Sequence, residues 1–128
     1  MLERLLRGIE RGDGPALADL YAEDAEVELP FALPEPRRLH GRDELRAHFA
    51  AARRAPLELS VRDLVVHETT DPEVIVAEFV YDGHVRTTGR AFTVSNVQLL
   101  RVRDGRIVAS RDYHDHARLA EAVAARAP

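Results

Sequence analysis

The sequence predicts a single α+β domain in which helices come first and a twisted antiparallel sheet follows. Three observations carry this prediction. The 128 residues are the usual size of one domain, so we expect one domain over residues 1–128. Apolar residues recur at helical spacing up to about residue 54 and mostly alternate with polar ones from residue 57 to 114. Helices on one face of a sheet enclose the core, and a pocket is expected between the two layers.

The first twenty residues have the pattern of a helical hairpin. The run 12–15, Gly-Asp-Gly-Pro, would end a first helix and open a second one. The residues expected to face inward are Leu2, Leu5, Leu6 and Ile9 in the first helix and Leu17, Leu20 and Tyr21 in the second.

A short strand is predicted from Ala25 to Leu29, and a proline-rich loop over residues 30–36 follows it. A third helix is predicted from Arg42 to about Arg54, because Pro56 ends it. Its apolar face would consist of Leu45, Phe49 and Ala52.

Strands account for most of the second half. We expect them around residues 57–61, over 74–81, from about 90 to 103 and over 106–114. Asp104-Gly105 is a strong hairpin signal between the last two, so the last three strands should form a meander. Leu119 and Val123 indicate a short terminal helix that fades into an Ala/Arg tail.

Composition excludes several classes of function. The net charge of −4 gives no basic surface for nucleic acid, and no apolar run is long enough to span a membrane. The absence of cysteine removes thiolate chemistry, and the absence of lysine removes Schiff-base chemistry. No secretory signal is visible, so a soluble cytoplasmic protein without a cofactor is expected.

Two amides stand out on the long strand. Asn96 and Gln98 are the only Asn and Gln residues of the protein, and alternation places them on one face with Phe92, Val94 and Leu100. Buried amides require hydrogen-bond partners. Those partners are either structural groups or a ligand.

The last strand carries candidate acid/base groups. Ser110, Asp112 and His114 share one face with Val108. If that face lines the cavity, Asp112 and His114 are neighbours that tune each other's protonation. The alternative is that Asp112 pairs with an arginine or faces solvent.

Other candidates are weighed against structural roles. His114 and His116 do not predict a metal site, because no further ligands are indicated. Asp115 is placed to cap the terminal helix. Tyr81 shares a strand face with Ile75, Ala77 and Phe79, so its phenol points into the cavity or packs in the core.

The runs TGRAF (88–92), VRDGRI (102–107) and RDYHD (111–115), with GD (12–13), LYAEDA (20–25) and HGRDEL (40–45), resemble SnoaL-like and limonene-epoxide-hydrolase-like proteins. The resemblance covers nearly the whole chain. It implies the cone-shaped α+β roll of nuclear transport factor 2-like and cystatin-like proteins, with a curved antiparallel sheet, three N-terminal helices and an internal hydrophobic pocket. Homodimers are usual in these families.

Residue by residue, the resemblance argues against two family reactions. Asp112 looks like the aspartate that activates water in epoxide hydrolases, but Phe79 and Tyr81 stand where those enzymes have an Arg-x-Asp pair, and Val27 and Leu29 replace their water-holding residues. Epoxide hydrolysis is therefore not expected.

Ketosteroid isomerases would have their general base at Leu29, their N-terminal tyrosine at about Leu5 and their oxyanion-holding acid near Asn96. In SnoaL-like polyketide cyclases an acid/base aspartate lies near the end of the last strand. Asp115 matches it best by spacing, and Asp112 is the alternative. Among the enzymatic hypotheses, cyclase chemistry is the one that the residues contradict least.

These patterns favour a cofactor-independent isomerase or cyclase, or a related lyase or hydrolase, acting on an apolar polyketide- or steroid-like carbonyl compound. Asp112 would move the proton, His114 would set its charge state, and Asn96, Gln98 or Tyr81 would hydrogen-bond the enolate oxygen. The expected substrate-binding residues are Phe79, Val94, Gln98, Leu100 and Ser110.

Two other functions fit the same residues. The first is a non-catalytic domain that binds a small ligand. The second is a dimerising interaction module that uses the opposite sheet face around Arg111 and Tyr113.

Overall fold

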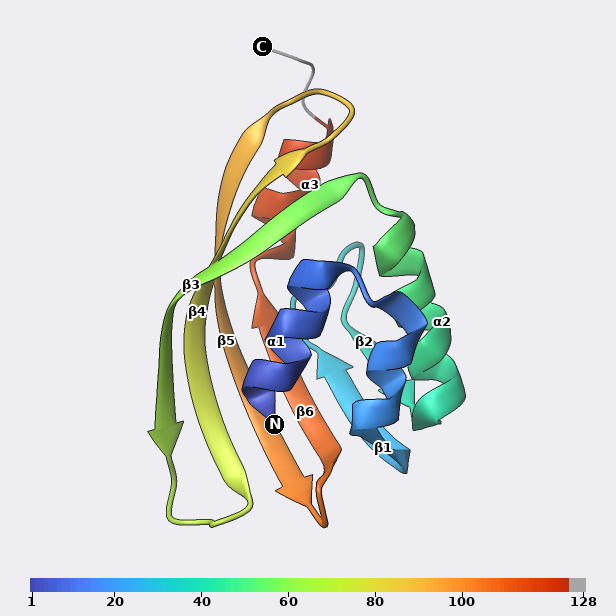
Figure 1. The fold of residues 1–128 in the computed structure, drawn as a ribbon, viewed down its shortest axis with the longest axis vertical. Helices are drawn as coiled ribbons and strands as arrows, with labels where there is room; N and C mark the ends of the chain where they lie inside the picture. The colour runs from blue at the N-terminus through green and yellow to red at the C-terminus, as the bar shows by residue number, and fades with distance from the viewer. Residues whose placement is uncertain (125–128) are drawn as a thin grey trace.

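The computed structural model describes residues 1–124, which fold into a curved sheet with helices packed on its inner face (Figure 1). The Ala/Arg tail expected at residues 125–128 lies outside this part. No helix of the described residues is long and apolar enough to cross a bilayer. The elements are α1 (Leu2–Arg11), the 3-10 helix η1 (Gly14–Leu20), β1 (Tyr21–Leu29), β2 (Arg37–His40), α2 (Gly41–Arg54), β3 (Leu57–Glu68), β4 (Val74–Val85), β5 (Ala91–Arg103), β6 (Arg106–His114) and α3 (His116–Ala124).

Six strands form one open sheet in the order β2-β1-β6-β5-β4-β3. The meander predicted for the last three strands is present, and β3 extends it by one more antiparallel pair. The prediction of a purely antiparallel sheet is corrected at one place, because β1 runs parallel to β6. A parallel pair needs a long connection, and residues 30–105 separate these two strands. The α+β class is confirmed, with a mixed sheet.

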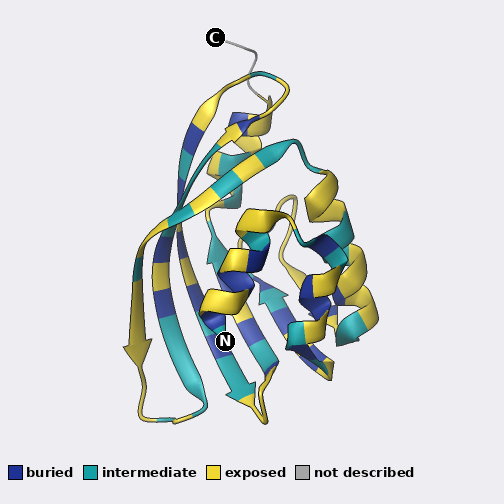
Figure 2. Cartoon of the chain, viewed as in Figure 1, coloured by how far each residue is buried: buried dark blue, intermediate teal, exposed yellow. Residues whose placement is uncertain are grey.

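The main core lies between the sheet and the N-terminal helices. Leu2, Leu5 and Leu6 of α1 pack with Phe79 and Leu100 of the sheet, and all five side chains are at most 3% exposed. Figure 2 shows these inward helix faces and the central strand residues as buried. The leucines at helical spacing and the alternate residues of the strands therefore pack together in one inner layer.

A second, smaller core forms under α3. Val85, Phe92 and Val94 pack with Leu119 and Ala122 of this helix. Tyr81 packs against both clusters. It therefore lies at the boundary between the part of the sheet that α3 covers and the part that the N-terminal helices cover. The predicted terminal helix is confirmed and closes one end of the inner face.

Two local predictions are corrected at the N-terminal side. The second helix is a 3-10 helix that ends at Leu20, and Tyr21 opens β1 instead of closing the helix. The apolar spacing of so short a segment fits either helix type, whereas an aromatic residue fits a strand well. Strand β2 lies beyond the proline-rich loop and escaped prediction because Leu39 is its only buried residue.

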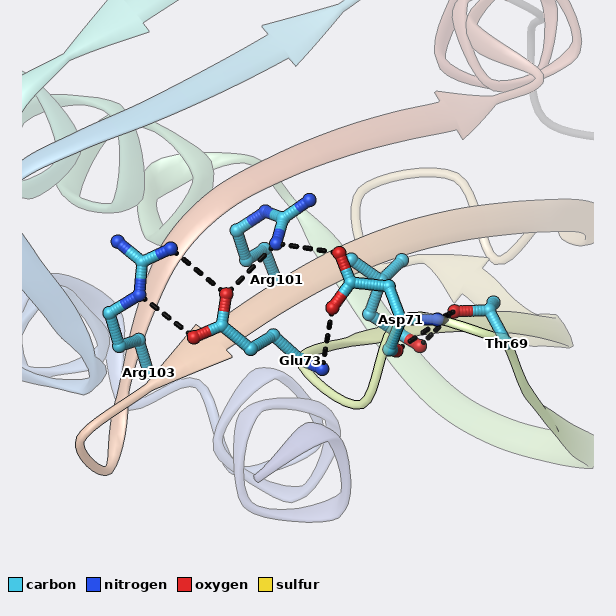
Figure 3. Close-up of polar contacts among 6 residues, drawn as sticks. Thr69, Asp71, Glu73, Arg101 and Arg103 are labelled. Carbon is cyan, nitrogen blue, oxygen red and sulfur yellow. Dashed lines mark hydrogen bonds and ion pairs between the residues drawn. The ribbon is translucent and has the colours of Figure 1, made fainter.

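An ion-pair network fixes the turn between β3 and β4 to the neighbouring strand β5 (Figure 3). Arg101 contacts both Asp71 and Glu73 at 2.9 Å, and Arg103 contacts Glu73 at 2.8 Å. Hydrogen bonds from Arg103 and Arg101 lower the pKa of Glu73 to about 2. The Thr69 hydroxyl braces the turn by donating to the Val74 carbonyl oxygen at 2.9 Å.

Candidate functional site

A row of polar side chains crosses the inner face of the sheet between β5 and β6. The register pairs Asn96 with His114, Gln98 with Asp112 and Leu100 with Ser110. Asn96 and Gln98 are each 3% exposed, Ser110 is 2% exposed and Asp112 is 9% exposed. Alternation along the two strands brings these groups together under the helices, at the place where the sequence predicts a cavity.

Asp112 is buried without an arginine partner. Gln98 Nε2 donates to Ser110 Oγ at 3.4 Å, and the Ser110 hydroxyl donates in turn to Asp112 Oδ1. None of the ion pairs within residues 1–124 includes Asp112. Burial raises the pKa of Asp112 to about 6, against the opposing effect of hydrogen bonding by Ser110 and Gln98.

His114 has a separate partner. Its Nδ1 lies 2.7 Å from Asn96 Oδ1, while Asn96 Nδ2 donates to the Val94 carbonyl oxygen at 3.2 Å. Because the Asn96 amide nitrogen is committed to a carbonyl, its oxygen must accept, and the His114 proton then lies on Nδ1. Burial, followed by the nearby His116 and His48, lowers the pKa of His114 to about 4. The ring is neutral at pH 7, and its Nε2 is an acceptor without a hydrogen bond to a described residue.

Asp112 and His114 do not set each other's pKa in the way the sequence predicts. Each group bonds to its own neighbour on the strands, and burial is the largest cause of both pKa shifts. The result is a carboxyl group whose pKa is near neutral, close to an uncharged imidazole.

Tyr81 lies beside this row. Its ring centroid is 5.3 Å from that of Phe79 and 6.0 Å from that of His114. Burial, with the Asp112 charge second, raises the pKa of Tyr81 above its usual range. The Tyr81 hydroxyl has no hydrogen bond to any described residue, although the side chain is half-buried.

Tyr21 belongs to the same buried group and was missed as a site residue. It is 2% exposed, and its pKa is raised by burial, then by Asp112 and by Tyr81. The signal that would have found it is alternation from Tyr21 onward along β1. Glu23 is exposed at a position where alternation would place a buried residue, so the sequence predicted that the strand begins only at Ala25.

The remaining candidates divide between core and surface. Val94 is 2% exposed, and Leu100 has no accessible surface, so both pack in the core. Asp115 is exposed, and its Oδ1 accepts from the Arg118 backbone N–H at 3.1 Å at the start of α3. Asp115 is thus placed as a helix cap, as one of its two sequence interpretations expects.

A groove of about 650 Å³ lies on the opposite, outer face of the sheet. Its walls include Phe31, Val65, Val97 and Tyr113, and the rings of Phe31 and Tyr113 meet edge to face with centroids 5.4 Å apart. Asp112 is not among the groove's lining residues. The lining does include other predicted site residues, namely Phe79, Asn96, His114 and Asp115. The pocket predicted around Asp112 stays a prediction.

Known proteins and solved structures resemble this chain over most of its length. Over 126 residues the chain is 34% identical to an uncharacterised PhzA/B-like protein of Pseudomonas aeruginosa, covering 96% of this chain and 87% of that protein. A solved Bacillus subtilis structure described provisionally as an isomerase superposes with a TM-score of 0.86 at 29% identity, covering 94% of this chain and 88% of that one.

A Xanthomonas campestris structure described provisionally as a polyketide cyclase superposes with a TM-score of 0.79 at 22% identity, covering 96% of this chain and 93% of that one. This likeness shows the shared fold. Residues 2–110 also match the SnoaL-like domain family. The chain therefore belongs to the SnoaL-like domain family, whose members share the nuclear transport factor 2-like fold.

Proposed function

We propose that this protein is a cofactor-independent acid/base isomerase or cyclase acting on an apolar carbonyl compound of polyketide- or steroid-like character. One observation carries the proposal. Asp112 is a buried carboxyl group with a pKa of about 6, and no ion pair within residues 1–124 holds it. A base whose pKa lies close to the working pH both accepts and returns a proton efficiently.

The hydrogen-bond directions leave one oxygen of Asp112 available. Ser110 donates to Oδ1, and the described residues give Oδ2 no hydrogen bond, although Gln98 approaches the carboxyl group closely enough to lower its pKa. Side-chain oxygen and nitrogen atoms that are completely buried in the described part all have partners. Oδ2 therefore keeps some accessible surface, and we propose that it borders the pocket predicted between the sheet, α3 and the N-terminal helices.

The proposed reaction uses groups already in place. Asp112 Oδ2 takes a proton from the carbon next to the substrate carbonyl, and the Tyr81 hydroxyl donates to the enolate oxygen that forms. In an isomerisation Asp112 returns the proton at another carbon. In a cyclisation the enolate carbon attacks a second carbonyl group, and the proton passes to the new alkoxide.

Hydrogen bonding within the protein favours one of the three proposed oxyanion donors. Asn96 is bonded to Val94 and His114, and Gln98 is bonded to Ser110, so both amides are engaged within the protein. Tyr81 is the one of the three proposed donors whose side chain has no hydrogen bond to any described residue. The raised pKa of Tyr81 keeps that hydroxyl protonated at all physiological pH values.

Deuterium exchange tests the proposal. The protein is incubated in D₂O with a panel of cyclic ketones and β-diketones, and exchange at the α-carbon is followed by NMR. We expect Asp112→Asn to reduce exchange by at least about 100-fold. Exchange by the parent protein should rise with pH through about 6 and then level off, because the Asp112 base must be ionised.

Asp104→Asn in the β5–β6 turn is the matched control, since Asn also tolerates the positive φ of 52° found there. Asp115→Asn separates the alternative aspartate from Asp112. Exchange that survives Asp112→Asn, or that falls only in Asp115→Asn, would contradict the assignment.

A second candidate, ligand binding without catalysis, is favoured by a different observation. Phe79 and Leu29, both at most 3% exposed, occupy positions where the resemblance implies catalytic groups, and they pack in the core instead. Binding of the ketones that depends on Asp112, without any exchange, would favour this function.

We also infer that the outer sheet face joins two copies of the chain. Phe31, Val65 and Val97 line its groove and are 59%, 48% and 39% exposed, which is unusual for large apolar side chains so close together. The face includes Tyr113, around which the sequence predicts a dimer contact.

A further inference from the structure

Tyr21 and Tyr81 are two phenols on the inner face whose hydroxyl groups have no hydrogen bond to a described residue. Tyr21 is the more unusual of the two, because its side chain is 2% exposed. A buried hydroxyl normally finds a partner, and the side-chain polar atoms that are completely buried in residues 1–124 all do. The Tyr21 hydroxyl must therefore keep a small accessible surface at which a ligand or water can pair with it.

The ring of Tyr21 is held firmly in place. Its backbone carbonyl accepts two hydrogen bonds from Arg42, from Nη2 at 2.8 Å and from Nε at 3.2 Å. The ring packs against Phe49 of α2 with centroids 5.9 Å apart, and the backbone pairs with Ile107 of β6. A phenol fixed at both its backbone and its ring has one direction in which to donate, which lowers the entropic cost of binding a ligand.

Tyr21 points into the same region as the proposed base. It belongs to the main core cluster against which Tyr81 packs, and its hydroxyl is close enough to Asp112 and Tyr81 to interact electrostatically with both. It enters from β1, beyond β6, whereas Tyr81 enters from β4 on the other side of β5. The two phenols therefore approach the polar row from opposite sides.

We propose that Tyr21 is a specificity-determining residue that donates a hydrogen bond to a second oxygen of the ligand, opposite the end that Tyr81 and Asp112 contact. The ligand class is a flat apolar compound with oxygen atoms at both ends. This inference rests on the proposed function for its ligand pocket, but not on catalysis.

The physical reason is the cost of leaving the phenol unpaired. A ligand that offers an oxygen to Tyr21 satisfies a buried donor, whereas a ligand that lacks it displaces any water there and leaves the donor without a partner. Sites built in this way discriminate strongly against analogues that lack the polar group. A change to phenylalanine should therefore alter the preference between ligands more than the affinity for an apolar one.

The test compares two rigid probes, 2-naphthol with one oxygen and 2,6-dihydroxynaphthalene with an oxygen at each end. Binding is measured by fluorescence titration with the full chain. We expect the parent protein to bind the diol about tenfold more tightly than 2-naphthol. Tyr21→Phe should abolish this preference while leaving the affinity for 2-naphthol within about twofold of the parent value.

Tyr113→Phe on the outer face is the matched control and should keep the full preference. Thermal melting of Tyr21→Phe checks the fold, since phenylalanine retains the packing on Phe49. A diol preference that persists in Tyr21→Phe overturns the inference, and so does a parent protein that binds neither probe or binds both equally.

The outcome is separable from that of the proposed function. Probe binding involves no proton transfer, and deuterium exchange is measured with other compounds. A lost diol preference with no exchange activity would leave Tyr21 in a binding site without catalysis. Exchange that depends on Asp112 with an unchanged diol preference would leave the catalytic proposal intact and Tyr21 without this role.

Discussion

At the scale of single residues, burial moves two neighbouring ionisable groups in opposite directions. It raises the pKa of Asp112 to about 6 and lowers that of His114 to about 4, because both uncharged forms are favoured away from water. The effects on stability oppose each other. The Asp112 carboxylate costs stability as pH rises from about 4 to 6, whereas charging of His114 costs stability as pH falls from about 6.5 to 4.

Single substitutions should separate the contributions of Asp112 and His114 to the pH dependence of stability. Relative to the parent, Asp112→Asn should gain stability as pH rises from 4 to 6 and hold a gain of roughly 1–3 kcal/mol at pH 7, because the buried charge is removed. His114→Gln should show its gain below about pH 5 instead, because no imidazole has to be charged. Urea unfolding between pH 4 and 7.5 measures both. Parallel pH profiles for the parent and the two variants would refute the burial explanation.

At the scale of elements, the long strands depend on polar contacts at their ends. The turn between β3 and β4 carries Asp71 and Glu73, and the β5 residues Arg101 and Arg103 fasten it (Figure 3). Since Glu73 has a pKa of about 2 in this network, its contribution is present above the ordinary glutamate pKa and is lost as pH falls toward 2. The network stabilises the sheet edge at neutral pH.

Glu73→Gln should lower the melting temperature by about 1–4 °C at pH 7, since exposed ion pairs contribute modestly. The loss should shrink in 1 M NaCl, where such pairs are screened. Glu68→Gln is the comparison variant, because Glu68 lies at the end of β3 outside the network. Equal effects of the two substitutions in low salt would show that the network adds nothing of its own.

At the scale of the whole molecule, the sheet has two different surfaces. The inner face carries the buried polar row under the helices, and the outer face carries the exposed apolar groove. Under the two proposals made above, chemistry takes place on the inner face and association on the outer face. This division also explains why a change on the outer face should alter assembly without disturbing the carboxyl group inside.

Val97→Asp should therefore convert the proposed dimer to a monomer, because it puts a charge on a side chain that lines the groove. Sedimentation velocity measures the change. Val123→Asp is the control, since Val123 on α3 is 43% exposed and lies outside the lining of the groove. A parent protein that sediments as a monomer at micromolar concentration would refute the association proposal.

The sequence by itself determined the local elements and which residues share a face. Helical spacing located α1 and α2, and alternation together with Asp104-Gly105 located β5, β6 and the turn between them. The same alternation grouped Asn96 with Gln98, and Ser110 with Asp112 and His114. These features depend on residues close together in the chain, so they could be predicted.

Tertiary structure decided what depends on distant segments. The parallel pairing of β1 with β6 joins residues 21–29 to residues 106–114, and no local pattern encodes it. Burial of Asp112 away from any arginine, and the position of Tyr21 within electrostatic range of it, follow from how the helices pack on the sheet and how β1 pairs within it. The pKa of Asp112 is set by that desolvation, which belongs to the assembled core and to no short stretch of sequence.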